Sequence, residues 1–241
     1  MIHITDTHIH LQDFNQDFAL PLLSSPNINH LILISANSND FNKISTLYHL
    51  HNTKITPSFG YHPWEANNTY DLPLLEDYLK KHSTSLIGEI GLDGIKQPPS
   101  KEQHQLFTSQ LDLAQKLNRP TIIHGAKALN ELSKYIKQLS SIKYVYHSFS
   151  PNTELLKFLN KSNAFIGLGS SFINHPKAKE YFHLLALNKI LFETDAPYQL
   201  KEENYLQNTT KNLIKLSNLS SIPLDELEEI LINNTMEFIK C

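Results

Sequence analysis

The stretch KEQHQLFTSQLDLAQKLNRPTIIH, residues 101–124, combines the pattern of an amphipathic helix with that of a short buried strand. Across 101–118 apolar side chains recur at helical spacing, and the preceding Ser100 suits the N-cap position. Pro120 ends this helix, and the apolar residues 121–124 then predict a strand. A helix that runs so directly into a strand is typical of an α/β protein.

The same alternation continues in both directions from this unit. The expected strands are 2–6, 30–35, 54–60, 85–91, 121–124, 143–147, 164–169 and 190–194. The expected helices are 39–50, 71–82, 101–118, 127–139, 152–161, 176–187, 202–219 and 223–239. Strands that alternate with helices indicate a parallel sheet with right-handed crossovers. We therefore expect one domain over residues 1–241, a (β/α)8 TIM-type barrel in regular or distorted form.

Composition narrows the classes of function. The chain has 241 residues, is 40% hydrophobic and carries a formal net charge of -3, so no general basic field attracts nucleic acid. No apolar run approaches the roughly 18 residues of a membrane span, and the start MIHITD lacks a signal-peptide pattern. The single cysteine, Cys241, cannot form a disulfide within the chain. These features favour a cytoplasmic location.

Polar residues of unusual type cluster at the ends of the expected strands. They are His8 and His10 after the first strand, Glu89 in the fourth, His124 and His147 at the ends of the fifth and sixth, and Asp195 after the eighth. In a barrel these strand ends all meet on one face. Histidine and carboxylate ligands suit Zn²⁺, Mn²⁺ or Mg²⁺. Six ligands exceed the need of one catalytic ion, so the set suits two ions about 3.5–4 Å apart that share a carboxylate.

Each of these residues also has a plain structural explanation when taken singly. A histidine at a strand end is more often a hydrogen-bonded rim residue than a metal ligand. Likewise, a glutamate among glycines, such as Glu89, can simply fill a turn. The metal hypothesis depends on all of them meeting on one face of the barrel.

Six motifs occur in an order that resembles the TatD family of metal-dependent hydrolases, within the amidohydrolase-like barrel superfamily. They are DTHIHL (6–11), FGYHPW (59–64), IGEIGLD (87–93), RPTIIH (119–124), YHSFS (146–150) and ETDAPY (193–198). The resemblance runs from Asp6 to about Asn233. It implies that one ion is bound by His8, His10, Glu89 and Asp195, and the second by Glu89, His124 and His147. It also implies that Asp6 orients a ligand from outside the metal shell.

Members of this family are metal-dependent nucleases, commonly 3′→5′ exonucleases on DNA or RNA, and some remove D-amino acids from tRNA. The resemblance implies a catalytic set of Asp195, Glu89 and His62. Asp195 would orient the attacking water and accept its proton. His62 would lie near the substrate phosphate, although it could equally be a packed turn residue. Glu193 could assist proton transfer or be structural, and Asp93 is expected to cap a loop.

One position departs from the family pattern. Many relatives carry an arginine two positions after the histidine of the fifth strand, where this chain has Ala126 followed by Lys127. Arg119, the only arginine, begins that strand at the opposite end of the barrel. Without an arginine fork, phosphate would be held by the ions, by His62 or by a lysine. Lys127 is therefore a candidate for substrate binding.

The sequence supports three hypotheses of function. The first is a two-metal phosphodiesterase or deoxyribonuclease of exonuclease type that acts on nucleic acid, with no membrane or obligate protein partner. The second is a metal-dependent ester, lactone or amide hydrolase, including D-aminoacyl-tRNA deacylation, which the missing arginine favours slightly. The third is a non-catalytic metal-binding barrel, against which the complete set of ligand types argues.

Overall fold

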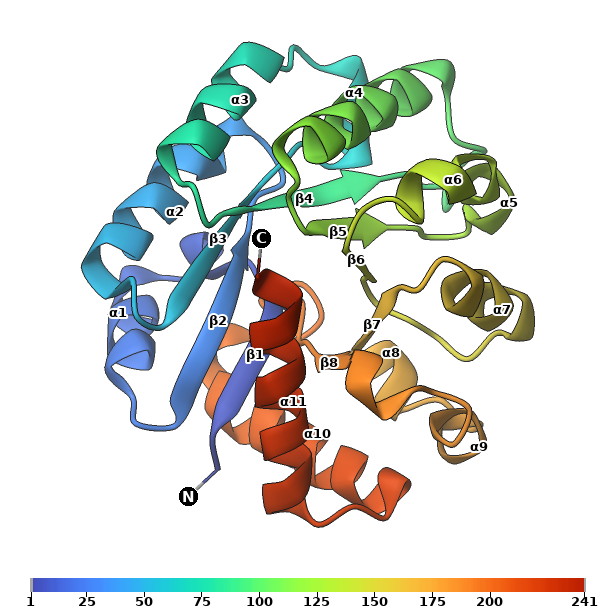
Figure 1. Ribbon diagram of the computed structural model, residues 1–241. Helices are drawn as coiled ribbons and strands as arrows, with labels where there is room; N and C mark the ends of the chain where they lie inside the picture. Colours follow the sequence, from blue (N-terminus) through green and yellow to red (C-terminus); the bar gives the residue numbers. More distant parts are fainter. Residues whose placement is uncertain (1, 241) are drawn as a thin grey trace.

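A computed structural model describes residues 2–240 and shows eight parallel strands that follow one another around a barrel in sequence order (Figure 1). The strands are β1 (Ile4–Ile9), β2 (Ile28–Ile34), β3 (Ile55–Phe59), β4 (Leu86–Gly91), β5 (Thr121–His124), β6 (Tyr144–Tyr146), β7 (Phe165–Leu168) and β8 (Ile190–Phe192). This confirms the predicted (β/α)8 TIM-type fold. Met1 and Cys241 lie outside the described residues, so the disulfide argument and the domain limits 1–241 stay predictions.

Helices surround the barrel on its outer side (Figure 1). They are α1 (Gln16–Ser24), α2 (Ser38–His51), α3 (Leu72–Lys81), α4 (Lys101–Leu117), α5 (Leu129–Leu132), α6 (Ile136–Leu139), α7 (Thr153–Lys161), α8 (Ser170–Ile173), α9 (Ala178–Phe182), α10 (Tyr205–Ser220) and α11 (Leu224–Ile239). Short 3-10 helices occur at 11–13, 63–67, 133–135, 187–189 and 202–204. No helix within residues 2–240 is long and apolar enough to cross a membrane.

The helix α4 shows how local chemistry sets the element boundaries. The Ser100 hydroxyl accepts a hydrogen bond from the Gln103 backbone N–H and so caps the first turn, as the sequence predicts. The helix ends at Asn118, whose φ of 49° lies in the left-handed region that asparagine tolerates. Pro120 follows, and β5 begins at the next residue.

The first strand differs from its predicted range of 2–6. It runs from Ile4 to Ile9, so His8 lies inside the strand and His10 directly after it. The sequence pattern also misses α1, because Pro21 lies within that helix and normally argues against one. Both differences arise because tertiary pairing and packing override a local signal.

Two predicted helices are shorter in the structure. The segment 127–139 becomes helical only at Leu129, because Lys127 has a left-handed φ of 49° that is incompatible with a helix start. It is then divided into α5, the 3-10 helix 133–135 and α6. The segment 176–187 contains only α9. The backbone N–H groups of Leu184 and Leu185 bond to carbonyls three residues earlier, and this tighter turn ends the helix.

Apolar side chains form two layers, one on each side of the sheet. The outer layer packs the strands against the helices. The inner layer fills the barrel and consists of Ile32, Ile34, Leu86, Ile122, Val145, Phe165, Leu191 and Phe238. Phe238 comes from α11, whose last turn lies over the barrel in the view of Figure 1. Since side chains alternate along a strand, residues two positions further on share the inner face.

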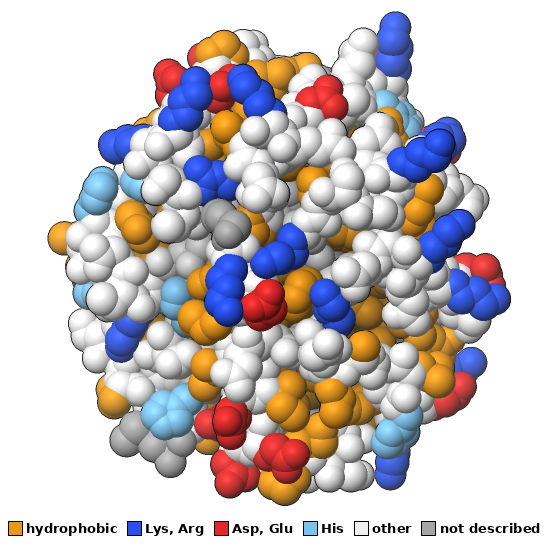
Figure 2. Space-filling model, viewed as in Figure 1, with side chains coloured by type: hydrophobic (Ala, Val, Ile, Leu, Met, Phe, Trp, Pro, Cys, Tyr) orange, Lys and Arg blue, Asp and Glu red, His pale blue; other side chains and the backbone are white. Residues whose placement is uncertain are grey.

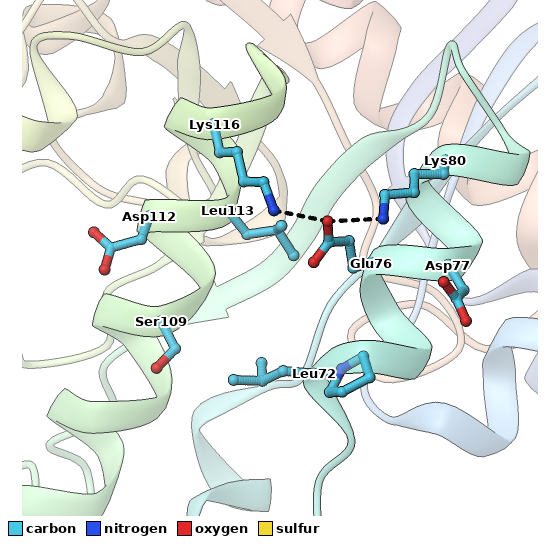
Figure 3. Close-up of a pocket in the computed structure, with 9 residues that line it drawn as sticks. Leu72, Glu76, Asp77, Lys80, Ser109, Asp112, Leu113 and Lys116 are labelled. Carbon is cyan, nitrogen blue, oxygen red and sulfur yellow. Dashed lines mark hydrogen bonds and ion pairs between the residues drawn. The ribbon is translucent and has the colours of Figure 1, made fainter.

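The outer helices α3 and α4 are joined by exposed charges. Figure 3 shows Glu76 between Lys80 and Lys116, at 2.9 and 2.8 Å. These pairs line a groove of about 430 Å³ on the outer wall of the barrel. Exposed pairs of this kind contribute little to stability.

Candidate metal centre

The six predicted ligand residues meet at the C-terminal end of the barrel. Together with His62, they form three groups, and within each group the donor atoms lie within 4.8 Å of one another. The groups are His8–Glu89–His147, His8–His10–Asp195 and His62–Glu89–His124. His62, which the sequence analysis assigned to substrate, therefore lies among the candidate ligands. His147 lies with His8, whose ring it stacks against at 3.6 Å.

Glu89 lies at the centre of these groups and is buried. Its Oε2 is 3.5 Å from His8 Nε2, whereas its Oε1 is 2.8 Å from His124 Nδ1 and 4.0 Å from His147 Nε2. Burial alone would raise the pKa of Glu89, but these three histidines together hold it well below its usual range. One oxygen of this carboxylate thus faces His8, and the other faces His124 and His147.

Asp195 connects the remaining histidines. Its Oδ1 is 3.5 Å from His10 Nε2 and 3.8 Å from His8 Nε2, while Oδ2 is 3.6 Å from His147 Nε2. Burial opposes ionisation, but the neighbouring imidazoles of His10 and His147 keep the pKa of Asp195 far below its ordinary value. The side-chain amide of Gln199 also donates to Oδ2 at 2.8 Å. Asp195 is therefore a carboxylate at neutral pH.

Closure of the barrel runs directly through these residues. The Asp195 backbone N–H donates to the His8 carbonyl, and the His10 N–H donates to the Ala196 carbonyl, both at 2.8 Å. Asp195 itself has a φ of 54°, a left-handed conformation that is uncommon for a residue other than glycine. The seam between β1 and β8 thereby sets the backbone positions of three candidate ligands.

Two further carboxylates lie behind candidate ligand imidazoles. Asp93 Oδ2 accepts a hydrogen bond from His124 Nε2 at 2.9 Å, and Glu193 Oε2 is 3.1 Å from His147 Nδ1. Carboxylates placed in this way fix the ring orientation of metal-binding histidines. Burial would lower the pKa of His124, but Glu89 and Asp93 outweigh it and raise that pKa to about 9.

The role of Asp93 extends beyond the loop cap that the sequence suggests. Its Oδ1 does accept from the Ile95 backbone N–H, as a capping residue would. Its other oxygen, however, joins His124 to the indole N–H of Trp64. The only signal in the sequence was an acidic residue just past a strand end.

Glu193 connects β8 with the segment that follows β6. Its Oε2 lies beside His147, and its Oε1 accepts a hydrogen bond from the Ser148 backbone N–H at 2.6 Å. Gly167 makes room for it, because a Cβ at that position would come within 2.1 Å of Glu193 Oε2. A glycine is therefore needed on β7 so that a glutamate can fit on β8.

Asp6 acts through the backbone instead of through an imidazole. It is fully buried and accepts hydrogen bonds from the His8 N–H, from Thr194 and from the Tyr205 hydroxyl. Burial raises its pKa to about 7 against the effect of these bonds. Asp6 thus joins β1 to the segment after β8 and to α10, and it positions His8 through the peptide chain.

The substrate candidates lie around the centre. His62 is buried, its Nε2 is 3.4 Å from His124 Nδ1, and burial lowers its pKa to about 4. Its Nδ1 also accepts the Trp64 backbone N–H, so His62 is a turn residue as well. Lys127 lines a hollow of about 940 Å³ formed by the loops after β4, β5 and β6. Arg119 instead bonds to the Ser85 and Leu79 carbonyls at the other end of the barrel.

The donor set fits a divalent cation. Both ring nitrogens of His8 are buried, and neither has a hydrogen-bond partner within residues 2–240. The closest carboxylate oxygens to Nε2 lie at 3.5 and 3.8 Å, so that an ion between them would satisfy all three groups. Imidazole nitrogens combined with carboxylates suit Zn²⁺ or Mn²⁺.

Comparisons with known proteins identify the family. The family model described as TatD related DNase matches residues 5–240. Deoxyribonuclease TATDN3 of Homo sapiens is 24% identical, covering 98% of this chain and 94% of its own. The uncharacterized metal-dependent hydrolase YjjV of Escherichia coli is 26% identical, covering 95% of each.

The same architecture occurs among solved structures. The crystal structure of the TatD homologue YjjV from Escherichia coli K12 superposes with a TM-score of 0.80 at 23% identity. That superposition covers 97% of this chain and 96% of the other. With a family model that spans nearly the whole described chain, the protein belongs to the TatD family.

Proposed function

We propose that this protein is a divalent-metal-dependent phosphodiesterase of deoxyribonuclease type that uses two ions. The observation that carries the proposal is the position of Glu89, whose two oxygens face histidines on different sides. A shared carboxylate of this kind is what a two-ion site requires. A relative over nearly the same length, human TATDN3, is named a deoxyribonuclease. In this proposal the residues that hold the ions are His8, His10, Glu89, His124, His147 and Asp195.

Divalent ions bound here would activate water and neutralise charge on a phosphoryl oxygen. In this proposal Asp195, an ionised carboxylate at the C-terminal end of the barrel, orients the attacking water and takes up its proton. Water adds across the P–O bond, and the proton then passes to the leaving oxygen. His62, which lies in the group with Glu89 and His124, orients the phosphate together with Lys127.

Metal titration with a parallel nuclease assay tests this proposal. Protein stripped with a chelator should regain hydrolysis of a DNA oligonucleotide on addition of Zn²⁺, Mn²⁺ or Mg²⁺, and bind about two ions per chain. His124→Ala should reduce the stoichiometry. Saturation at one ion, with no change in His124→Ala, would contradict the shared site.

A second candidate function is hydrolysis of a carboxyl ester, a lactone or an amide, including D-aminoacyl-tRNA. Arg119 favours it, because the only guanidinium of the chain is bonded to carbonyls away from the centre. A panel of DNA, RNA, an aryl ester, a lactone and a D-aminoacyl-tRNA decides between the two. Inactivity on every substrate by fully loaded protein would favour a non-catalytic metal-binding barrel. A cytoplasmic location stays a part of the proposal that rests on sequence alone.

A further inference from the structure

Two exposed aromatic side chains flank the metal centre. Trp64 is 65% exposed, and its ring lies edge-on to that of His62 at 4.8 Å. Tyr198 is 66% exposed, and its ring lies edge-on to that of His10 at 5.0 Å. These two histidines belong to candidate ligand groups that share no residue. The two rings therefore stand on different sides of the centre, on the β3 and β8 sides.

Each ring is held at its polar atom and left uncovered over much of its surface. The Trp64 indole N–H donates to Asp93 Oδ2 at 3.1 Å, and the Tyr198 hydroxyl donates to Asp13 Oδ2 at 2.9 Å. A side chain fixed in this way loses little conformational freedom when a ligand packs on it. An anchored, exposed aromatic ring offers apolar contact area to a flat ligand.

Basic side chains continue the track beyond Trp64. Lys96 Nζ lies 5.8 Å from the centre of the Trp64 ring, and it lines the 940 Å³ hollow together with Lys127. The hollow starts beside the centre, because Gly125 and Ser148 of its lining directly follow His124 and His147. An aromatic surface next to lysines matches a ligand with flat bases and a phosphate backbone.

We infer that bases of the nucleic-acid substrate stack on Trp64 and Tyr198, on the two sides of the phosphodiester that is cleaved. The inference rests on the proposed function and adds the residues that recognise the bases. The backbone beyond Trp64 then passes Lys96 and Lys127. Stacking is tolerant of base identity, so these rings select for the presence of a base and not for its sequence.

Each ring also has a possible positioning role, which the experiment must separate from stacking. Trp64 contacts Asp93, which holds His124, and Tyr198 contacts His10 directly. Phenylalanine at either position keeps a ring but removes the hydrogen-bond donor, whereas alanine removes both. The comparison of Phe with Ala variants therefore isolates the ring.

Steady-state kinetics on two matched substrates provide the first test. One is a DNA oligonucleotide, and the other has the same length but abasic residues around the cleaved bond. Trp64→Ala and Tyr198→Ala should each lower kcat/KM on the intact substrate by about 5- to 100-fold, mainly through KM. The preference for intact over abasic DNA should shrink accordingly, whereas Trp64→Phe and Tyr198→Phe should retain it. Leu50→Ala, which removes a side chain of similar exposure (63%) on α2, is the matched control.

Fluorescence gives a test that does not require turnover. Trp64 is the only tryptophan of the chain, so its emission reports on this position alone. A non-cleavable phosphorothioate oligonucleotide should quench it on binding, and the abasic counterpart should not. The inference would be overturned if the Ala and Phe variants lost kcat/KM equally on both substrates. It would also be overturned if Trp64 emission were not quenched in a saturated complex. Failure of the proposed function would give a different result, because the metal-loaded protein would then cleave neither DNA substrate.

Discussion

The two ends of the barrel are built from the same strands but serve different purposes. On β5 and β6 the inward residues Ile122 and Val145 belong to the apolar interior, and two positions later His124 and His147 reach the candidate metal centre. At the N-terminal end the interior is closed by Phe238, packed 5.2 Å from Phe165. On one face of a strand, a residue of the apolar interior and a candidate metal ligand are therefore only two positions apart.

Hydrogen bonds from a lysine also stabilise the N-terminal end of the barrel. Lys143 donates to the Glu237 and Lys240 carbonyls at 2.9 and 2.8 Å and so completes the last turn of α11. Figure 2 shows basic side chains gathered near the middle of this face, where α11 ends. If the division between the ends is real, changes at one end should affect activity and changes at the other should affect stability.

The largest effect is expected at the C-terminal end. Asp195→Asn removes the proposed proton acceptor and should lower kcat on DNA by roughly 10²- to 10⁴-fold. The melting temperature should change little, because the backbone seam with His8 does not use the side chain. Measurement of kcat and thermal unfolding on the same sample checks both statements. Near-normal turnover would assign the proton to another group.

Phe238→Ala tests the opposite end. Loss of a buried aromatic side chain should lower the free energy of unfolding by about 3–5 kcal/mol. Urea unfolding measures this, with Phe238→Leu as a milder control. At a temperature where both proteins are folded, ion stoichiometry and kcat should match the wild type. A change in metal affinity as large as the change in stability would contradict the separation of the two ends.

His30 sharpens the comparison, because it is a histidine inside the barrel that is not at the metal centre. Its Nε2 is 2.8 Å from the Thr56 hydroxyl, and burial lowers its pKa to about 4. The unfolded chain therefore takes up a proton at higher pH than the folded chain does. The contribution of His30 to the free energy of unfolding is fully present above pH 6.5. It is lost between about pH 6.5 and 4, by up to about 3 kcal/mol.

The contribution of His30 is measured as a difference. The free energy of unfolding of the wild type and of His30→Gln is followed from pH 7.5 to 4, with chelator present in both series. The histidines of the metal centre are common to both proteins and cancel. Parallel pH profiles would show that His30 is not the buried neutral group that the structure indicates.

Ala126→Arg is expected to have the smallest effect. A guanidinium at the rim of the hollow adds a charge-assisted bond to phosphate, and Lys127 already supplies part of that charge. KM for DNA should fall by roughly tenfold, whereas turnover of an ester should not improve. An unchanged KM, together with a silent Lys127→Ala, would show that phosphate does not bind on this side.

The sequence was sufficient for the strands and for the convergence of the candidate ligands, since the barrel brings all strand ends to one face. It did not predict that His62 lies beside His124, because that contact depends on the conformation of a loop. The pairing of Asp93 with His124 was missed for the same reason. Tyr198 is the last residue of the last motif, but only the packing of the loop after β8 places its ring against His10.

The seam between the first and last strands has a consequence for biosynthesis. Asp6 and Thr194 bond across 188 positions of sequence, and the neighbouring seam bonds join His8 and His10 to residues after β8. A chain emerging from the ribosome therefore carries most of its candidate ligands long before the centre can form. Under the proposed function, hydrolysis is therefore withheld from nascent and truncated chains, and metal binding coincides with the final closure of the fold. Ions that bind only the closed barrel would then stabilise it against unfolding at the seam.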